Sequence, residues 1–464
     1  MVKLFGGVVA GVAALVLATA ATAAPPTFSN TTLFSSWSPS AFFQPPPGLV
    51  TAPHANQSGN SEPAIDFGGP GNVMAVDGLG WLPFQVNLWK GHFGDMPPAY
   101  FGGMDTLLPI SGAGRVNLGD GDADVEVTSA GTILLADLDI ILNHALNNAQ
   151  LGVSVTRCPA AATGPAGCTS TLLDQAGADR EWITTIGTNA WLSYHDSASS
   201  SLIHVWRSTN DGRTWSPVSS PIPGQGSVTG NSTFNNSIGP IVADSHTGNV
   251  YQPFTAGEAG IQKGTSSAFN NVYVSRSTDG GRTWTAHLVY HAPLFTDLAN
   301  FWPALGVDPS TGTLYTAWTD RHGVWVSSST DAGDHWSMPL KVSTATTTVM
   351  PWVAALNGKV DVVYYGSSAA STDDPTAVWN TYDSQLQGGV WSTGVVSNTP
   401  NRVGRVCLQG SACTADRELL DLFEVAEDPV SGKAAVIYTD TTIDTWTDQG
   451  VTHQLPEIVL AYEQ

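Results

Sequence analysis

The sequence predicts an all-β protein, a β-propeller of four-stranded blades, from three observations. A unit of two apolar strands around a glycine turn recurs along the chain, and a polar turn ending in tryptophan occurs three times. Only 12% of the 464 residues are charged, whereas 48 are glycine. This composition is typical of turn-rich β proteins, and repetition of one unit explains how so long a chain can form a single domain.

The two-stranded unit occurs seven times, at intervals of roughly 50 to 70 residues, which suits a four-stranded blade with decorated loops. In each copy, strands of mainly apolar residues flank a turn that contains glycine. The copies span residues 63–77, 124–138, 181–196, 238–254, 303–320, 351–366 and 422–440. We therefore favour seven blades, with six as the alternative.

The N-terminus has the features of a secretory signal peptide. Lys3 precedes an apolar run from Leu4 to about Ala18, and small residues follow as far as Ala23. We predict a signal peptide at 1–23 and a mature protein that is secreted, either extracellular or periplasmic. No later segment is long and apolar enough to cross a bilayer.

The chain ends at EIVLAYEQ, which is only the third strand of the seventh unit. The fourth strand must come from elsewhere in the chain. The natural donor is the N-terminal segment and linker at 24–60, and we expect the strand itself within residues 31–43. Such an exchange would tie the two ends of the chain together and hide a sheet edge. Residues 61–464 are then the propeller domain.

The charge of the chain limits its expected binding partners, and the positions of its cysteines indicate how they pair. The chain has 17 Lys and Arg against 39 Asp and Glu, a formal charge of −22, which disfavours nucleic acid and anionic membranes as partners. We expect a monomer. Four cysteines allow three pairings, and proximity favours Cys158–Cys168 and Cys407–Cys413.

The three tryptophan-ending turns are RSTNDGRTW (207–215), RSTDGGRTW (276–284) and SSTDAGDHW (328–336). An alternating strand runs into each turn and another follows it, so each is expected to be the tip of a hairpin. The Asp or Asn side chain can accept backbone N–H groups, and the glycine can take a positive φ. The tryptophan can bury its ring against the sheet.

These turns resemble the Asp-box, also called the bacterial neuraminidase (BNR) repeat, S-x-D-x-G-x-x-W. The matching residues are Ser208, Asn210 (in place of Asp), Gly212, Trp215, Ser277, Asp279, Gly281, Trp284, Ser329, Asp331, Gly333 and Trp336. The resemblance implies a sialidase-like propeller, in which the box is a structural turn on the face away from the active site. True sialidases have six blades.

The opposite face is expected to bind ligands, and the sequence places polar residues in its loops. Ahead of the blades lie Glu62, the acids of GDGDAD, and ADRE at both 178–181 and 415–418. The structural alternative is that these arginines pair with carboxylates and brace one blade against the next. The GDGDAD acids Asp120, Asp122 and Asp124 are weak candidates for a Ca²⁺ site, because calcium prefers oxygen ligands.

Sialidases bind a sugar carboxylate through three arginines and use a Tyr nucleophile, with Glu and Asp for proton transfer. By resemblance, the substrate-binding candidates are Arg180, Arg321, Arg417 and His195, with Trp302 and Trp352 as exposed stacking platforms. The catalytic candidates are Glu181, Asp196 and Tyr194. The catalytic pattern of the family is not matched, because Ser61-Glu62-Pro63-Ala64-Ile65 stands where sialidases carry Phe/Tyr-Arg-Ile-Pro.

Three functions remain open at this point. The first is a secreted, sialidase-like propeller that acts on glycans, with glycoside hydrolysis by a pair of carboxyl groups. The second is a propeller that binds a glycan or a protein without catalysis. The third is a calcium-dependent variant of either; otherwise no cofactor is expected.

Overall fold

The computed structural model describes residues 23–35, 59–80, 86–104, 115–143, 149–175, 177–196, 202–222, 236–257, 269–299, 301–409, 413, 415–448 and 450–464. The side chains of 115–120, 142–143, 149 and 446–448 lie outside this description. So does the predicted signal peptide up to residue 22. Among the described residues, no helix has the length and apolar character needed to span a membrane.

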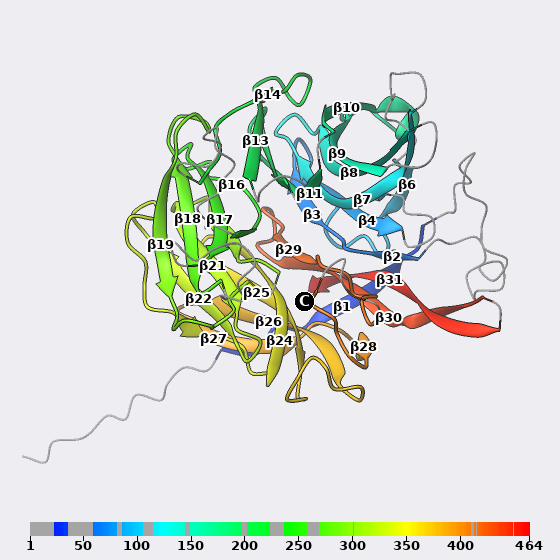
Figure 1. Ribbon diagram of the computed structural model, residues 1–464, viewed down its shortest axis with the longest axis vertical. Helices are drawn as coiled ribbons and strands as arrows, with labels where there is room; N and C mark the ends of the chain where they lie inside the picture. Colours follow the sequence, from blue (N-terminus) through cyan, green and yellow to red (C-terminus); the bar gives the residue numbers. More distant parts are fainter. Residues whose placement is uncertain are drawn as a thin grey trace, which may run out of the picture.

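Seven antiparallel sheets surround a common axis, which confirms the prediction of a seven-bladed propeller (Figure 1). Blade 1 contains β2 (Asn60–Ser61), β3 (Ile65–Gly68), β4 (Val73–Gly80), β5 (Val86–Gly91) and β6 (Ala99–Gly103). Blade 2 contains β7 (Arg115–Val127), β8 (Ile133–Asn143), β9 (Ala149–Cys158) and β10 (Thr169–Asp174), with the 3-10 turn η2 (Pro165–Gly167) before β10. Blade 3 contains β11 (Ala178–Ile186), β12 (Asn189–Asp196), β13 (Leu202–Ser208) and β14 (Ser216–Pro217).

The remaining blades follow in chain order. Blade 4 contains β15 (Asn236–Ile238), β16 (Val242–Ala243), β17 (Val250–Ala256), β18 (Asn271–Ser277) and β19 (Thr285–His291). Blade 5 contains β20 (Ala304–Asp308), β21 (Thr313–Thr319), β22 (Val324–Ser329) and β23 (Leu340–Lys341). Blade 6 contains β24 (Thr347–Leu356), β25 (Lys359–Ser367), β26 (Val378–Gln387), β27 (Val390–Val395) and β28 (Arg402–Val403). Blade 7 contains β29 (Glu424–Glu427), β30 (Ala434–Asp448), β31 (Val451–Glu463) and β1 (Phe28–Leu33).

The last blade is completed by the N-terminal strand. β1 pairs antiparallel with β31, from Phe28 opposite Glu463 to Leu33 opposite Ile458. The long hairpin of β30 and β31 projects from the ring in red, with blue β1 beside it (Figure 1). Of the segment 31–43, only residues 31–33 belong to this strand, and residues 36–43 lie outside the described part. The exchange covers the edge of β31 that would otherwise expose unpaired backbone groups.

The hydrophobic core lies between neighbouring blades, because each sheet is apolar on both faces. One cluster joins Met74 and Trp89 of blade 1 to Ile437 and Leu460 of blade 7. Comparable clusters connect blades 1 and 2, blades 2 and 3, and blades 5 and 6.

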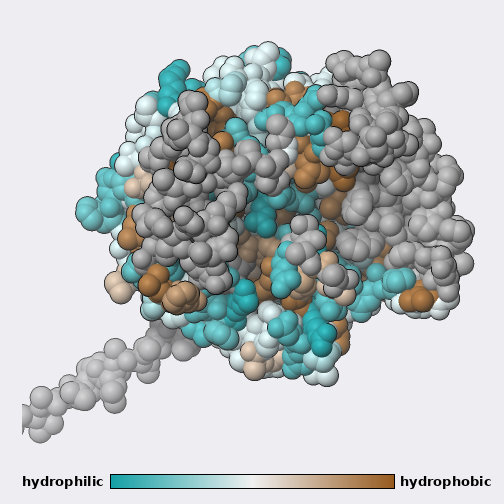
Figure 2. Space-filling model, in the orientation of Figure 1, coloured by the Kyte–Doolittle hydropathy of each residue, from teal (hydrophilic) through white to brown (hydrophobic). Residues whose placement is uncertain are grey.

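On the face shown in Figure 2, the coloured hydrophobic residues are scattered in small groups among hydrophilic ones.

The three tryptophan-ending turns have nearly the same geometry. In the turn at 276–284, Ser277 Oγ accepts the N–H of Gly281 at 2.8 Å, and Asp279 Oδ1 accepts the N–H of Thr283 at 2.9 Å. Trp284 Nε1 donates to the carbonyl of Gly281 at 3.0 Å. The other two turns repeat the Ser–Gly and Trp–Gly bonds. Each turn therefore satisfies its own backbone and fixes its tryptophan against the hairpin.

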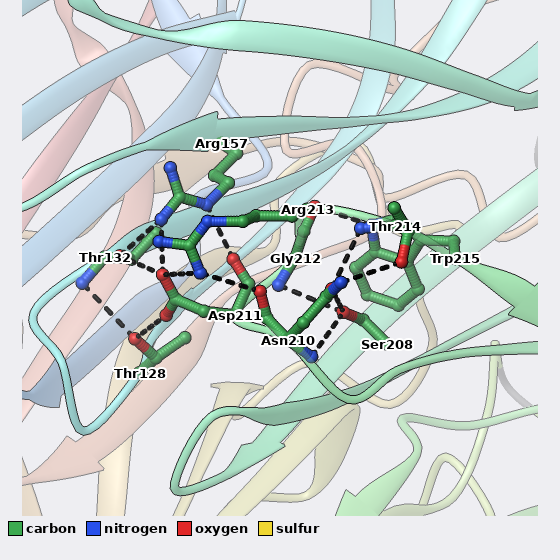
Figure 3. Close-up of polar contacts among 10 residues, drawn as sticks. All are labelled: Thr128, Thr132, Arg157, Ser208, Asn210, Asp211, Gly212, Arg213, Thr214 and Trp215. Carbon is green, nitrogen blue, oxygen red and sulfur yellow. Dashed lines mark hydrogen bonds and ion pairs between the residues drawn. The ribbon is translucent and has the colours of Figure 1, made fainter.

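Arginines at the ends of third strands connect these turns to the preceding blades. Arg157 Nε donates to the carbonyl of Asp211 at 2.6 Å, and its terminal nitrogen pairs with the Asp211 carboxylate (Figure 3). Thr128 and Thr132 donate to the same carboxylate at 2.7 and 2.8 Å. Arg276 repeats the contact by donating to the carbonyl of Ala332 at 2.8 Å. The turns therefore hold blade to blade, which is a structural role.

Both predicted disulfides are present. Cys158–Cys168 joins the ends of the hairpin between β9 and β10, and Cys407–Cys413 closes a loop between blades 6 and 7. The first replaces the tryptophan turn that blade 2 lacks.

Candidate binding site at the blade axis

A cavity of about 670 Å³ lies at the end of the axis where the inner strands begin. Its wall combines equal numbers of charged and apolar side chains with a few uncharged polar ones, a composition suited to a polar ligand. The lining residues are Asp122, Leu138, Ile140, Leu151, Asp179, Arg180, Asn236, Ser237, Phe269, Asp297, Ala299, Phe301, Arg321, Leu408, Gln409, Arg417 and Asp421. We call this space the axial cavity.

The three arginines predicted to bind substrate all line the axial cavity. Arg180 donates from Nη1 to Ser237 Oγ at 3.2 Å, and its Cζ lies 4.8 Å from the centre of the Trp302 ring. Arg417 donates to Asp421 Oδ2 at 2.8 Å. Arg321 Nη2 lies 3.3 Å from Asp297 Oδ2. Each guanidinium is therefore oriented by a neighbour, which is distant in the chain for Arg180 and Arg321 and four residues away for Arg417.

Backbone strain is concentrated where the inner strands begin. Glu62, Arg180, Phe301, Met350 and Leu420 have left-handed φ values between 48° and 82°, although none is glycine. The pairing register shifts beside two of them, in blades 3 and 6. Such residues cost about 1–3 kcal/mol each and cluster at functional sites, where the surrounding structure holds them.

Asp122, which lines the axial cavity, forms a carboxyl pair with the buried Glu62. A hydrogen bond links Glu62 to Asp122, and the N–H of Asp421 donates to Glu62 Oε1 at 2.7 Å. Burial, followed by the charges of Asp122 and Asp421, raises the pKa of Glu62 well above its ordinary value. Burial and the charge of Asp179 raise the pKa of Asp122 to about 6. The pair can therefore hold a shared proton near neutral pH.

Glu181, a predicted catalytic residue, is buried next to this pair but does not line the axial cavity. Neither of its carboxyl oxygens has a hydrogen-bond partner among the described residues. Burial raises the pKa of Glu181 well above its ordinary value, and the charges of Asp122, Asp179 and Asp137 raise it further. Its surroundings behind the cavity wall therefore favour the protonated form of Glu181.

The other two catalytic candidates lie away from the axial cavity. Tyr194 is buried between blades 2 and 3, where its hydroxyl donates to Asp174 and its ring stacks on His204 at 5.0 Å. Asp196 lies 3.6 Å from Nε2 of His204. His195 lies between them on β12 and does not line the cavity either. The predicted combination of Glu181 with Asp196 and Tyr194 is therefore not brought together at this site.

Neither candidate tryptophan is an exposed platform. Trp302 is 4% exposed and packs edge-on against Trp182 with ring centres 5.1 Å apart. It supports Arg180 from beneath by the cation–π contact described above. Trp352 is half-buried and lines a different cavity.

That second cavity, of about 360 Å³, lies at the opposite end of the axis and is rich in acids. Its carboxylates join blades: Asp66 accepts the N–H of Val127 at 2.7 Å, and Asp124 accepts that of Ile183 at 2.8 Å. Glu424 accepts the N–H of Ile65 at 3.0 Å. Asp124 thus serves the packing of inner strands.

The GDGDAD acids do not gather in one place. Asp122 lines the axial cavity and Asp124 the cavity at the other end, while the side chain of Asp120 lies outside the described part. Within the described ranges, no group of three or more His, Cys, Asp and Glu side chains could hold a metal ion. The calcium site remains a prediction.

Because of these buried acids, we expect the free energy of unfolding to fall as the pH rises. Burial raises the pKa of Asp66 and of Asp124 to about 7, so the folded chain keeps protons that the unfolded chain loses near pH 4. Between these two pKa values, each such acid lowers the free energy of unfolding by about 1.4 kcal/mol for every unit by which the pH rises. We expect the urea midpoint to fall from pH 5 to pH 8.

Asp66→Asn is the matched control, since the amide oxygen can still accept from Val127. Its unfolding free energy should depend less steeply on pH than that of the wild type over this range. A midpoint that is equal or higher at pH 8 would contradict the assignment of buried, protonated acids.

Several cavity residues have no clear signal in the sequence. Asp421 lies in the apolar stretch LLDLF, and Asp297 and Phe301 come from a long loop between blades. Leu408 and Gln409 directly follow Cys407 and reach the cavity from the connection between blades 6 and 7. The spacing of Arg417 and Asp421, four residues apart, is compatible with an ion pair but does not predict one.

Comparisons with known proteins support the fold and leave the activity open. No known protein family matches the sequence, and no curated protein matches it either. A polysaccharide lyase, a PL25 ulvan lyase, is 11% identical with a TM-score of 0.50, covering 86% of this chain and 94% of its own.

Two further structures are more distant. An α-L-arabinofuranosidase from Fusarium graminearum is 12% identical with a TM-score of 0.45, covering 74% of this chain and 93% of its own. A mutant sialidase from Trypanosoma rangeli is 13% identical with a TM-score of 0.45, and the match covers 77% of this chain and 56% of the sialidase. At such identities the likeness is one of fold alone.

Proposed function

We propose that the protein is a secreted glycan-acting propeller whose axial cavity binds the carboxylate of an acidic sugar. The observation that carries this proposal is the convergence of Arg180, Arg321 and Arg417 on one cavity. A guanidinium presents a planar fork of donors that matches a carboxylate, and each fork here is already oriented. The glycan-acting enzymes among the structural neighbours and the two disulfides are in keeping with this role. We also assign the three tryptophan-ending turns as Asp-boxes.

Hydrolysis of a glycosidic bond is the reaction that we favour. Asp122 lines the cavity, and its pKa of about 6 lets it carry a proton at mildly acidic pH. In this scheme Asp122 donates that proton to the glycosidic oxygen as the C–O bond breaks. Asp179, which lines the same cavity, takes a proton from the water that forms the new C–O bond.

Binding without turnover is the second candidate, and one observation favours it. No tyrosine is present among the described residues that line the axial cavity, so a nucleophile of the sialidase type is missing from this wall. The buried position of Tyr194 offers no substitute.

The test combines binding and turnover. We would titrate N-acetylneuraminic, glucuronic and galacturonic acids calorimetrically, and assay their fluorogenic glycosides at pH 5 to 8. We expect Arg180→Ala and Arg417→Ala each to weaken binding of the preferred sugar at least about 10-fold, since a charged hydrogen bond contributes roughly 1.5–3 kcal/mol. Asp122→Asn should abolish turnover and preserve binding.

Arg213→Ala is the matched control, because Arg213 belongs to a tryptophan-ending turn and is 60% exposed. If Arg180→Ala weakens sugar binding but no glycoside is hydrolysed, the second candidate function, binding without turnover, is favoured. If no acidic sugar bound, or if Arg213→Ala weakened binding as much as Arg180→Ala, the axial site would be ruled out.

A further inference from the structure

A third cavity, of about 360 Å³, adjoins the axial cavity. The two share three lining residues, Arg321, Leu408 and Gln409, so they are neighbouring compartments on either side of these side chains. The remaining wall consists of Thr372, Asp373, Arg405, Val406, Cys407, Cys413, Ala415 and Asp416. We call this space the side cavity. Apart from the three shared residues, none of its lining residues belongs to the proposed axial site.

The wall of the side cavity is held firmly. Arg402, which is 2% exposed, donates from Nη1 to Glu418 Oε2 at 2.7 Å and from Nε to the carbonyl of Arg405 at 2.6 Å. The N–H of Val406 donates to the backbone carbonyl of Thr372, and that of Cys407 to the backbone carbonyl of Asp416, both at 2.9 Å. The Cys407–Cys413 disulfide closes the loop. These contacts hold the described part of the wall in place before a ligand arrives, which reduces the entropy lost on binding.

One arginine of the side cavity is available to bind an anion. Arg402 lies 3.6 Å from Asp416 and also bonds Glu418, so its single positive charge is shared between these two acids. Arg405 donates from Nε to the carbonyl of Asp373 at 2.9 Å. Its two terminal nitrogens make no hydrogen bond to a described residue, although the side chain lines the cavity. An oriented guanidinium with free donors is suited to a carboxylate.

We infer that the side cavity is a subsite for a second acidic sugar, so that the ligand is an acidic oligosaccharide with charged groups on adjacent residues. The inference rests on the proposed function of the axial cavity. Arg321 lies between the two compartments and contacts both sugars, while Arg405 contacts only the second. The side cavity has a little over half the volume of the axial one, 360 against 670 Å³, and takes the residue next to the bound end sugar.

The experiment compares monomers with their dimers. We would measure Kd for galacturonic and digalacturonic acid, and for N-acetylneuraminic and α2,8-linked disialic acid. For at least one pair the longer sugar should bind about 10-fold or more tightly, a gain expected when a second charged contact is added. Arg405→Ala should remove most of this gain and leave the Kd of the monomer unchanged. Arg213→Ala, on the opposite face, should leave both values unchanged.

The outcomes separate the two proposals. If a monomer binds through Arg180 but every longer sugar binds no more tightly, or if Arg405→Ala does not reduce the gain, the side cavity is not a sugar subsite and the axial site stands. If neither monomers nor longer sugars bind, the proposed function itself fails and this inference fails with it.

Discussion

A chain that begins at residue 36, and so lacks β1, is expected to lose its cooperative folded state, whereas a chain that begins at Ala23 keeps it. β1 pairs six residues with β31 and buries Leu33 completely. Loss of these hydrogen bonds and of the Leu33 side chain amounts to on the order of 5 kcal/mol or more, which is comparable to the whole stability of a typical domain.

The loss extends beyond blade 7. Asn30 donates to the carbonyl of Val396 at 3.0 Å and accepts from the Tyr438 hydroxyl at 2.8 Å. Pro26 packs so closely on blade 6 that a Cβ on Gly394 would lie 2.2 Å from its carbonyl oxygen. The N-terminal strand therefore joins the last two blades as well as completing one sheet.

Thermal unfolding followed by circular dichroism would measure the effect, with light scattering to detect association through the exposed edge of β31. A synthetic peptide of residues 23–35 added in trans should restore the unfolding transition of the shortened chain. Leu33→Ala in the longer chain provides a milder variant, expected to lower stability by about 2–5 kcal/mol. An unchanged melting temperature for the chain that begins at residue 36 would show that β1 is dispensable.

Lys359→Met is expected to destabilise the protein by about 3–5 kcal/mol at neutral pH, because it removes the cation from a buried acidic cluster. Lys359 Nζ lies 2.5 Å from Glu463, 3.0 Å from Glu427 and 3.1 Å from Asp361. Its side chain is only 9% exposed, and these acids belong to blades 6 and 7. Methionine preserves most of the volume and leaves the carboxylates without a counter-charge.

The pH dependence of this variant distinguishes lost charge from lost packing. Burial would raise the pKa of Asp361, but a hydrogen bond with Glu427 and the charge of Lys359 hold it below its ordinary value. This part of the stability is therefore present at neutral pH and is lost as the pH falls below about 4. In Lys359→Met the orphaned acids can take up protons, and the difference from the wild type should be smaller at pH 5 than at pH 8. Lys433→Met, at a half-buried lysine in the turn after β29, should cost less than about 0.5 kcal/mol.

Urea unfolding of the three proteins at both pH values gives these differences directly. A cost below about 1 kcal/mol for Lys359→Met at pH 8 would contradict the cluster as described. A cost that is the same at both pH values would assign the effect to packing.

The disulfides and the arginine trio illustrate how far local patterns reach. Cys158–Cys168 and Cys407–Cys413 are separated by 10 and 6 residues, and short loops close at low entropic cost. Arg180 and Arg417 lie in two copies of ADRE, the first within β11 and the second in the loop before β29, and both line the axial cavity. Repetition therefore predicted that these arginines lie at the same end of the axis.

The sequence pattern did not show where the side chains of Glu181, Asp196 and Trp302 lie. Glu181 and Asp196 belong to adjacent strands of blade 3, yet β12 lies one strand farther from the axis than β11. The bulge between Asp179 and Trp182 breaks the two-residue alternation, so the direction of neighbouring side chains cannot be read from the pattern. Trp302 is buried because Trp182, from another blade, packs against it.

By itself, the sequence determined the all-β class, the repeated blade, the hairpin turns and the disulfides, because each depends on residues close together in the chain. Only the tertiary structure decided which polar groups meet. Lys359 binds acids 68 and 104 residues away, and Glu62 accepts a bond from a residue 359 positions later. Ring closure brings these groups together, and burial then sets their pKa values, since desolvation and neighbouring charge depend on the assembled axis.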